Sequence, residues 1–158
     1  MQLLYPMRKA LLIVCSLVSL SALAQSDDEK AVRAAISQLF DGMRKADTTL
    51  FKAVFVPTAS LQSIAKNKEG AVSVRSESIP NFIASVGKQK PGALDERLSA
   101  YEVRIDAELA IAWTPYVFYF NGQKSHCGVN VFTLVKLNGG WKIQAIIDTR
   151  RREGCPDL

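Results

Sequence analysis

The sequence predicts an α+β fold in which helices precede a set of long antiparallel strands. Three observations lead to this prediction. Apolar residues first recur at steps of three and four, the period of a helix that buries one face. From residue 59 onward they alternate with polar residues, as in strands, apart from one further helical stretch. Asn121-Gly122 and Asn138-Gly139-Gly140 then join long strand segments as hairpin turns.

The first 24 residues have the features of a secretory signal peptide. Arg8 and Lys9 precede an apolar run that is shorter than the roughly 20 residues of a membrane-spanning helix. The run ends at Ala22-Leu23-Ala24, after which we expect cleavage. The predicted mature chain, residues 25–158, is therefore secreted or periplasmic and has no membrane attachment.

The composition indicates one ordinary globular domain. Hydrophobic residues make up 48% and charged residues 22% of the 158 residues, which excludes a disordered chain and a multi-span membrane protein. Loss of Arg8 and Lys9 with the leader lowers the formal net charge from +5 to +3. Arg150-Arg151-Arg152 could form a phosphate or nucleic-acid patch, but such a run is more often a solvated strand end. We expect no nucleic-acid partner.

Two helices are predicted at the start of the mature chain. Ser26 and Glu29 have the spacing of a capping box, so the first helix begins there and is expected to end near Ala46. Its apolar stripe comprises Val32, Ile36, Leu39, Phe40 and Met43. Asp47 or Thr48 can cap a second, short helix that stops before Pro57. Its buried face is expected to comprise Leu50, Phe51, Val54 and Phe55.

A short hairpin and a third helix follow. Residues 60–64 and 71–75 alternate and flank a turn-like segment, which predicts the two strands of the hairpin. Ser76 or Ser78 precedes the third helix, which is expected to end at Gly87. The apolar face of this helix comprises Ile79, Phe82, Ile83 and Val86.

The remainder is predicted as four long strands, and the turns between them set which residues face each other. These strands are residues 97–105, 109–120, 124–137 and 141–149. The three-residue turn places Asn130 opposite Asp148 in the last hairpin. The two-residue turn before it makes Trp113 a neighbour of Asn130 on the same face. A slip of one residue would exchange the two faces, so either could be concave.

This order of elements resembles the nuclear transport factor 2-like superfamily over essentially the whole mature chain. Residues 138–143 look like the closing turn and strand of that superfamily, and residues 126–132 with 148–151 are similar to secreted bacterial members described as lumazine-binding-like or polyketide-cyclase-like. The resemblance implies a cone-like curved antiparallel sheet wrapped on three helices, a ligand cavity and a homodimer. It implies no particular reaction, because the scaffold hosts isomerases, dehydratases, epoxide hydrolases and non-enzymatic binders.

One face of the predicted sheet gathers side chains that could form a site. His126 and Asp148 could exchange protons, and Arg150 could bind an anion. The candidate ligand-binding residues are Trp113, Asn130 and Arg150 on this face, together with Tyr116, which is predicted on the opposite face. For each residue a structural role is the more frequent alternative, such as a cross-strand ion pair between a carboxylate and an arginine.

Two functions are compatible with these residues. The first is binding of a small aromatic or apolar molecule, or of a partner protein, without turnover, because no complete acid–base set is evident. The alternative is an isomerase, cyclase or dehydratase in which Asp148 abstracts a proton while His126 or Tyr116 stabilises the oxyanion. One histidine and no acid cluster make a metal site unexpected, and we expect no cofactor.

The cysteines are expected to form one disulfide. Cys15 leaves with the leader, so Cys127 and Cys155 are the two cysteines of the mature chain in an oxidising compartment. Gly154 and Pro156 favour a chain reversal that would bring Cys155 back to Cys127. The alternative is a pair of buried free thiols.

Overall fold

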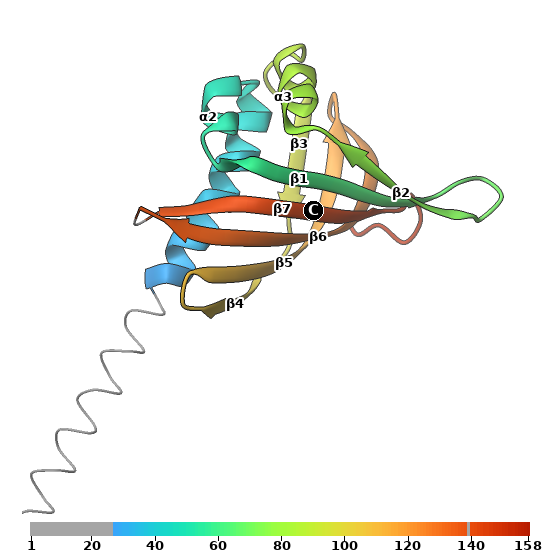
Figure 1. Cartoon of the computed structure of the whole chain (residues 1–158). Coiled ribbons are helices and arrows are strands. Elements are labelled where there is room, and N and C mark those ends of the chain that lie inside the picture. Colours follow the sequence, from blue (N-terminus) through green and yellow to red (C-terminus); the bar gives the residue numbers. More distant parts are fainter. Residues whose placement is uncertain (1–26, 139) are drawn as a thin grey trace, which may run out of the picture.

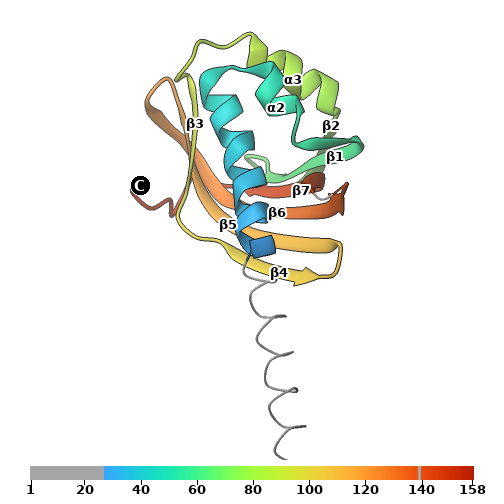
Figure 2. The same cartoon turned by 90° about the vertical axis from the view of Figure 1, so that its left-hand side faces the viewer.

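The computed structural model describes residues 27–138 and 140–158, in which three helices pack on one face of a curved sheet (Figures 1 and 2). The predicted signal peptide lies outside the described residues. None of the described helices is both long enough and apolar enough to span a bilayer. The α+β class and the cone-like arrangement predicted from the sequence are confirmed.

The three helices form where the apolar periodicity predicts them. The first covers residues 27–45, and α2 is Thr48–Lys52, capped by the Asp47 carboxylate, which accepts hydrogen bonds from two backbone N–H groups. The third, α3, is Ile79–Gly87 and is capped by Ser78. The prediction that Phe55 belongs to the second helix is wrong, because Phe55 begins a strand and pairs with Ile143.

Seven strands form one sheet. Their bounds are Phe55–Lys66 for β1, Val72–Glu77 for β2, Leu94–Leu98 for β3, Glu102–Asp106 for β4, Leu109–Phe120 for β5, Gln123–Leu137 for β6 and Gly140–Arg150 for β7. The strand order is β2-β1-β7-β6-β5-β3, and β4 also pairs with β5. The expectation of a wholly antiparallel sheet is wrong at one pair, because β1 and β7 run parallel. β1 and β7 lie far apart in the sequence, so no turn between them indicates how they pair. The alternation of apolar and polar residues in a strand is the same whether its neighbour runs parallel or antiparallel, so it does not indicate the direction either.

The single strand expected over residues 97–105 is in fact two strands. β3 pairs with the second half of β5 and β4 with the first half, and the break falls opposite Pro115. Proline has no backbone N–H to donate to a ladder, so continuous pairing is interrupted there. Ser99 donates its backbone N–H to the carbonyl of Pro115 at 3.0 Å and then leaves the sheet. The earlier start of β3 places Glu96 on a strand.

The hydrophobic core lies between the helices and the concave face of the sheet. All five residues of the predicted stripe on the first helix are buried there. They pack against Phe51 of α2, Phe132 of β6 and Trp141 of β7, among others. The Trp141 indole donates a hydrogen bond to Asp28, which also pairs with Lys136, so the start of the first helix is fixed to the end of the last hairpin.

Cys127 and Cys155 form the predicted disulfide, with their Cα atoms 5.5 Å apart. Arg151 exchanges two backbone hydrogen bonds with Cys127, both of 2.9 Å, so the chain after β7 stays paired to β6 before it reverses. Beyond the bridge, the backbone oxygen of Leu158 accepts hydrogen bonds from Arg97 and Tyr119. The C-terminal segment is therefore held across the ends of β3 and β5.

Candidate functional site

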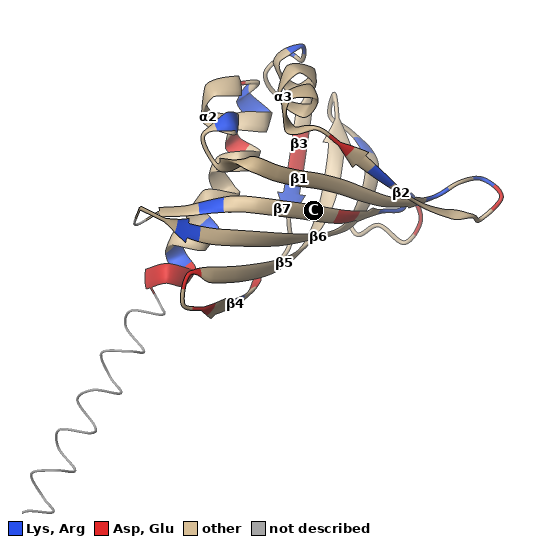
Figure 3. Ribbon diagram, viewed as in Figure 1, with Lys and Arg blue, Asp and Glu red and all other residues tan. Residues whose placement is uncertain are grey.

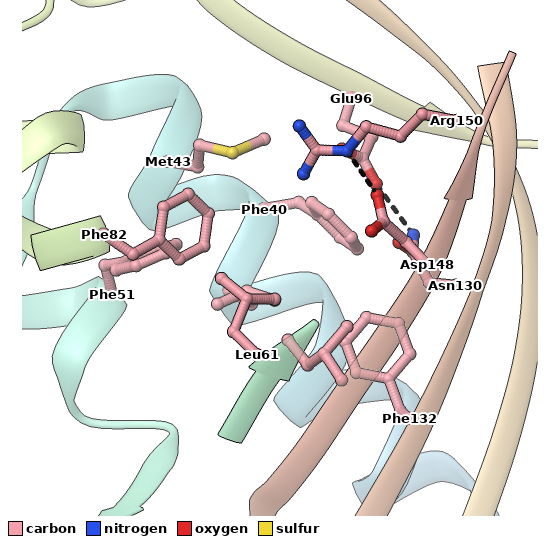
Figure 4. A pocket seen from close by; sticks show the side chains of 12 residues that line it. Phe40, Met43, Phe51, Leu61, Phe82, Glu96, Asn130, Phe132, Asp148 and Arg150 are labelled. Atoms are coloured by element: carbon pink, nitrogen blue, oxygen red, sulfur yellow. Dashed lines mark hydrogen bonds and ion pairs between the residues drawn. The ribbon is translucent and has the colours of Figure 1, made fainter. Parts of the chain in front are cut away.

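Alternate residues of β5, β6 and β7 face the helices and enclose the candidate site. The burial patterns of these strands place the even-numbered positions from Ala110 to Tyr116 and from Gly128 to Leu134 on the concave face. Asn130 pairs with Asp148, as predicted, but the three-residue turn predicted for the last hairpin is wrong. Leu137 pairs with Gly140, and an extra residue in β7 between Ile143 and Ala145 brings the register back to the predicted one. Both side chains are buried and point into the space between the sheet and the first helix (Figure 4).

The predicted position of Trp113 next to Asn130 is wrong. An extra residue in β6, between Lys124 and His126, shifts the pairing of β5 with β6 by one position. Thr114 therefore faces Asn130, and Trp113 faces Val131 on the convex side, where it is 49% exposed. The structure thus separates Trp113 from the other residues predicted to bind a ligand.

Asp148 is at the centre of the polar part of the site. Its residue is only 5% exposed, and its Oδ2 atom accepts hydrogen bonds from Arg150 Nε at 2.8 Å and from the Tyr116 hydroxyl at 3.2 Å. Its Oδ1 atom has no hydrogen-bond partner among the described residues. A buried carboxylate oxygen without a partner is costly, so this atom is positioned to accept a hydrogen bond from a bound molecule.

Glu96 is a second carboxyl group in the site, and the sequence analysis missed it. It lies on the concave side of β3 and accepts a 2.8 Å hydrogen bond from the amide of Asn130. Burial raises the pKa of Glu96 to about 7; the Asn130 bond opposes this rise, and the negative charge of Asp148 adds to it. The alternation of Leu94, Glu96 and Leu98 was the signal that could have revealed it.

Apolar side chains line the rest of the pocket. They are Leu39, Phe40, Met43, Phe51, Leu61, Phe82, Phe132 and Ile146. The cavity has a volume of about 40 Å³, which is room for roughly three water molecules. Figure 4 shows the polar cluster at one end of the pocket and the side chains of Met43, Phe51 and Phe82 at the other. The site therefore combines an apolar wall with one polar end.

The rings of His126 and Tyr116 pack against each other, but the two side chains differ in their distance from Asp148 and in their protonation. The His126 ring packs against Tyr116 and Phe118 and does not line the pocket that contains Asp148. Burial, with the positive charge of Arg150 next, lowers the pKa of His126 to about 4, so the ring is neutral at pH 7. Burial and the nearby carboxylates raise the pKa of Tyr116, so its hydroxyl stays a hydrogen-bond donor.

The described residues contain no group of three His, Cys, Asp or Glu side chains that could hold a metal ion together. The polar groups that line the pocket are two carboxyl groups, an amide and a guanidinium. The Tyr116 hydroxyl is not part of the lining, but it donates a hydrogen bond to Asp148. These groups can bind and orient a polar molecule, or move a proton to or from it.

The raised pKa of Glu96 predicts how Glu96→Gln changes stability with pH. Glu96 loses its proton near pH 4.5 in the unfolded chain and near pH 7 in the folded protein. Its contribution to the free energy of unfolding therefore falls between these two pH values and stays constant above them. The variant should match the wild type below pH 4.5 and exceed it by roughly 3 kcal/mol above pH 7.5. Urea unfolding at several pH values measures the difference.

The wild type and Glu96→Gln must be compared directly, because His126 changes stability with pH in the opposite direction to Glu96. Its lowered pKa makes stability rise with pH between about 4 and 6.5, which hides the effect of Glu96 in the wild type alone. Glu102→Gln, which removes an exposed carboxylate from β4, is the matched control and should leave the pH dependence unchanged. Parallel wild-type and Glu96→Gln curves would show that Glu96 has an ordinary pKa.

Solved structures with the same fold share little sequence with this chain. A nuclear transport factor 2-like protein from Novosphingobium aromaticivorans is 14% identical and matches 85% of this chain and 88% of its own, with a TM-score of 0.65. A protein of unknown function with a cystatin-like fold from Nostoc punctiforme is 13% identical, with coverages of 83% and 96% and a TM-score of 0.63. At these identities the likeness shows the fold alone.

A third structure has a described activity. It is a "putative dehydratase" of the nuclear transport factor 2-like family from Streptomyces avermitilis, 11% identical, with coverages of 80% and 98% and a TM-score of 0.64. The chain has no significant match among the curated proteins. A family model described as "Putative lumazine-binding" matches residues 27–146. The chain therefore belongs to this family, and its fold is that of nuclear transport factor 2-like proteins.

Proposed function

We propose that the protein is exported by the signal peptide of residues 1–24 and binds a small molecule in the pocket between the first helix and the sheet. The observation that carries the proposal is the buried Oδ1 atom of Asp148, which lacks a partner among the described residues at the polar end of an apolar pocket. Ligand sites have this composition, a mostly apolar lining with a few converging polar groups.

The polar groups of the pocket indicate which hydrogen-bond donors and acceptors the ligand carries. Asp148 Oδ1 requires a donor, so the ligand carries an N–H or O–H group at its polar end. Glu96 can donate when protonated and accept when ionised, so it suits a neighbouring carbonyl or ring nitrogen. A flat heterocycle that alternates N–H and C=O groups fits this pattern, and its rings would lie against Phe40 and Phe132.

The size of the pocket sets a condition for binding. Drug-sized ligands occupy cavities of about 300 Å³ or more, whereas this pocket has about 40 Å³. A ligand therefore enters when side chains of the wall move, and Met43 and Phe82 are suited to this. Met43 has an unbranched, flexible side chain, and Phe82 is only partly buried on α3.

Calorimetric titration with lumazine tests the proposal, because the description of the family model names that compound. We expect binding to the mature wild-type protein and a rise in its melting temperature. Asp148→Asn replaces one oxygen by a donor and should weaken binding about tenfold or more. Glu102→Gln, on exposed β4, should bind like the wild type. Absence of binding to lumazine and to every component of a metabolite pool would contradict the proposal.

A second candidate function, acid–base catalysis, is favoured by the near-neutral pKa of Glu96 beside Asp148. In a dehydration, Asp148 takes the proton from a carbon next to a carbonyl. Protonated Glu96 gives its proton to the departing hydroxyl group, which leaves as water. Glu96 replaces His126 as the acid in this scheme, because His126 is outside the pocket and already neutral at pH 7.

Solvent deuterium distinguishes catalysis from binding alone. A metabolite extract is incubated with the protein in D₂O and then examined by mass spectrometry. Catalysis predicts a compound that gains deuterium at carbon or loses water with the wild type, and does neither with Asp148→Asn. A binder without turnover leaves every mass unchanged.

We also propose a homodimer through the convex face of the sheet. Large apolar residues are exposed on this face, including Leu109, Ile111 and Trp113 of β5. A monomeric protein rarely exposes such a contiguous patch. Gel filtration should give the mass of a dimer, and Trp113→Glu should give a monomer. A wild-type monomer at high concentration would contradict the proposal.

A further inference from the structure

A second hollow lies at the end of the sheet, between the β1–β2 hairpin and the chain that follows β7. Its volume is about 1250 Å³, and its lining includes Lys66, Lys68, Arg75, Arg150, Arg151 and Arg152. Two carboxylates, Glu69 and Glu153, also line it. Six cations and two carboxylates give the lining a formal net charge of +4. We call this hollow the basic groove.

The cations of the basic groove come from segments far apart in the sequence. Parallel pairing of Ala65 with Arg150 brings Lys66 beside Arg151, and antiparallel pairing of Ser63 with Arg75 adds β2. Figure 3 shows Lys and Arg on the hairpin and at the adjoining end of β7. The parallel strand pair thus gathers the positive charge at one end of the sheet.

Most of these charges have no partner within the described residues. Arg150 pairs with Asp148, whereas the other five cations make no ion pair within 4.0 Å in that part of the chain. Like charges that line one hollow repel each other, and a bound anion removes this repulsion. Burial is the main cause of the low pKa of His126, and the charges of Arg150 and Arg152 lower this pKa further, which is consistent with such a field.

Both walls of the groove are fixed in place. In the hairpin loop, the side-chain oxygen of Asn67 accepts hydrogen bonds from the backbone N–H groups of Glu69 and Ala71. On the opposite wall, the backbone pairing of Arg151 with Cys127 and the disulfide to Cys155 hold the segment that carries Arg151 and Arg152. The backbone segments that carry these cations are therefore held in place on both walls.

We propose that the basic groove is a binding site for a ligand with clustered phosphate groups. Arginine side chains match phosphate with paired N–H groups, and lysines add point charges. Five cations without ion pairs on two walls exceed what a single carboxylate needs and suit several phosphates. The groove shares Arg150 with the Asp148 pocket, so the variants that test the groove leave Arg150 unchanged.

Inorganic tripolyphosphate is the probe for a soluble ligand, in calorimetric titrations of the mature protein at low and moderate salt. We expect binding that weakens steeply as salt increases. The variant Arg75→Ser/Arg152→Ser removes one cation from each wall and should lower the affinity about tenfold. Lys88→Ser/Lys90→Ser removes two exposed cations from the loop after α3 and should change it less than about twofold.

Vesicles of phosphatidylcholine, with and without phosphatidylglycerol, test whether the phosphate groups that bind to the groove belong to lipid headgroups of a membrane. Binding to tripolyphosphate alone identifies a soluble phosphate ligand, and binding only to the anionic vesicles identifies lipid headgroups. Absence of both overturns the proposal, as does an equal loss in the two double variants, which would show attraction to overall charge. If Arg75→Ser/Arg152→Ser has a lowered melting temperature, Lys66→Ser/Lys68→Ser in the hairpin replaces it.

Discussion

Replacing Gly128 with alanine is expected to destabilise the protein by more than about 3 kcal/mol. A Cβ atom at this position would lie 1.7 Å from the carbonyl oxygen of Thr149 and 3.0 Å from the ring of Tyr116. The Thr149 oxygen is a backbone atom, so β6 and β7 would have to separate. That movement also breaks the 3.0 Å hydrogen bond from the Tyr116 hydroxyl to the same oxygen.

Gly140→Ala is the matched control. It lies at the start of β7, and its added Cβ would have its nearest neighbour at 3.9 Å, which is ordinary contact. Urea unfolding should place Gly140→Ala within about 1 kcal/mol of the wild type. The lumazine titration should show that Gly128→Ala loses binding, because Tyr116 reaches Asp148 by crossing over Gly128. A stable Gly128→Ala variant with intact binding would contradict this close packing.

Removal of the disulfide has the second large expected effect. Cys127 and Cys155 are 28 residues apart, and closing such a loop in the unfolded chain costs about 3–4 kcal/mol of chain entropy. Cys127→Ser/Cys155→Ser should therefore lower the melting temperature by about 10 °C. The variant should also release the segment after β7, where Leu158 contacts Arg97 and Tyr119, to proteolysis.

The measurement is a thermal melt with and without reductant, together with thiol titration of the unfolded mature protein. Wild type should show no free thiol before reduction and should melt lower after it. The double serine variant should be insensitive to reductant, which separates loss of the bridge from other effects. Two titratable thiols in the wild type without reductant would refute the prediction.

Local sequence signals were sufficient for most of the fold. Asn121 and Gly122 have the positive φ angles of 51° and 79° that a two-residue hairpin requires. The strand before them has the predicted bounds, and the strand after them begins one residue earlier than predicted. Asp47 and Ser78, which cap α2 and α3, were each one of two residues that side-chain chemistry had offered as caps. The parallel pairing of β1 with β7 could not be predicted in this way, because it depends on contacts between segments some eighty residues apart.

The site was predicted in part, and the omissions have two physical causes. The extra residue in β6 moved Trp113 to the convex face, and no residue type near Ser125 signals such a bulge. Glu96 was missed because the strand was expected to begin at Arg97, and strand ends are the least certain feature of a sequence pattern. The pairing of Asn130 with Asp148 was predicted correctly, but for the wrong reason. The last hairpin starts one position out of the predicted register, with Leu137 opposite Gly140, and an extra residue in β7 between Ile143 and Ala145 restores it.

The parallel pairing of β1 with β7 also has a consequence for the order of folding. β5, β6 and β7 are joined by short turns, so their contacts close small loops and can form early. β1 can join only after a loop of about eighty residues has closed, which is the slowest step that the topology requires. The Asp148 pocket and the basic groove both include residues of β1, so neither exists until that strand has docked. In refolding followed by stopped flow, recovery of ligand binding should therefore lag behind the formation of β structure.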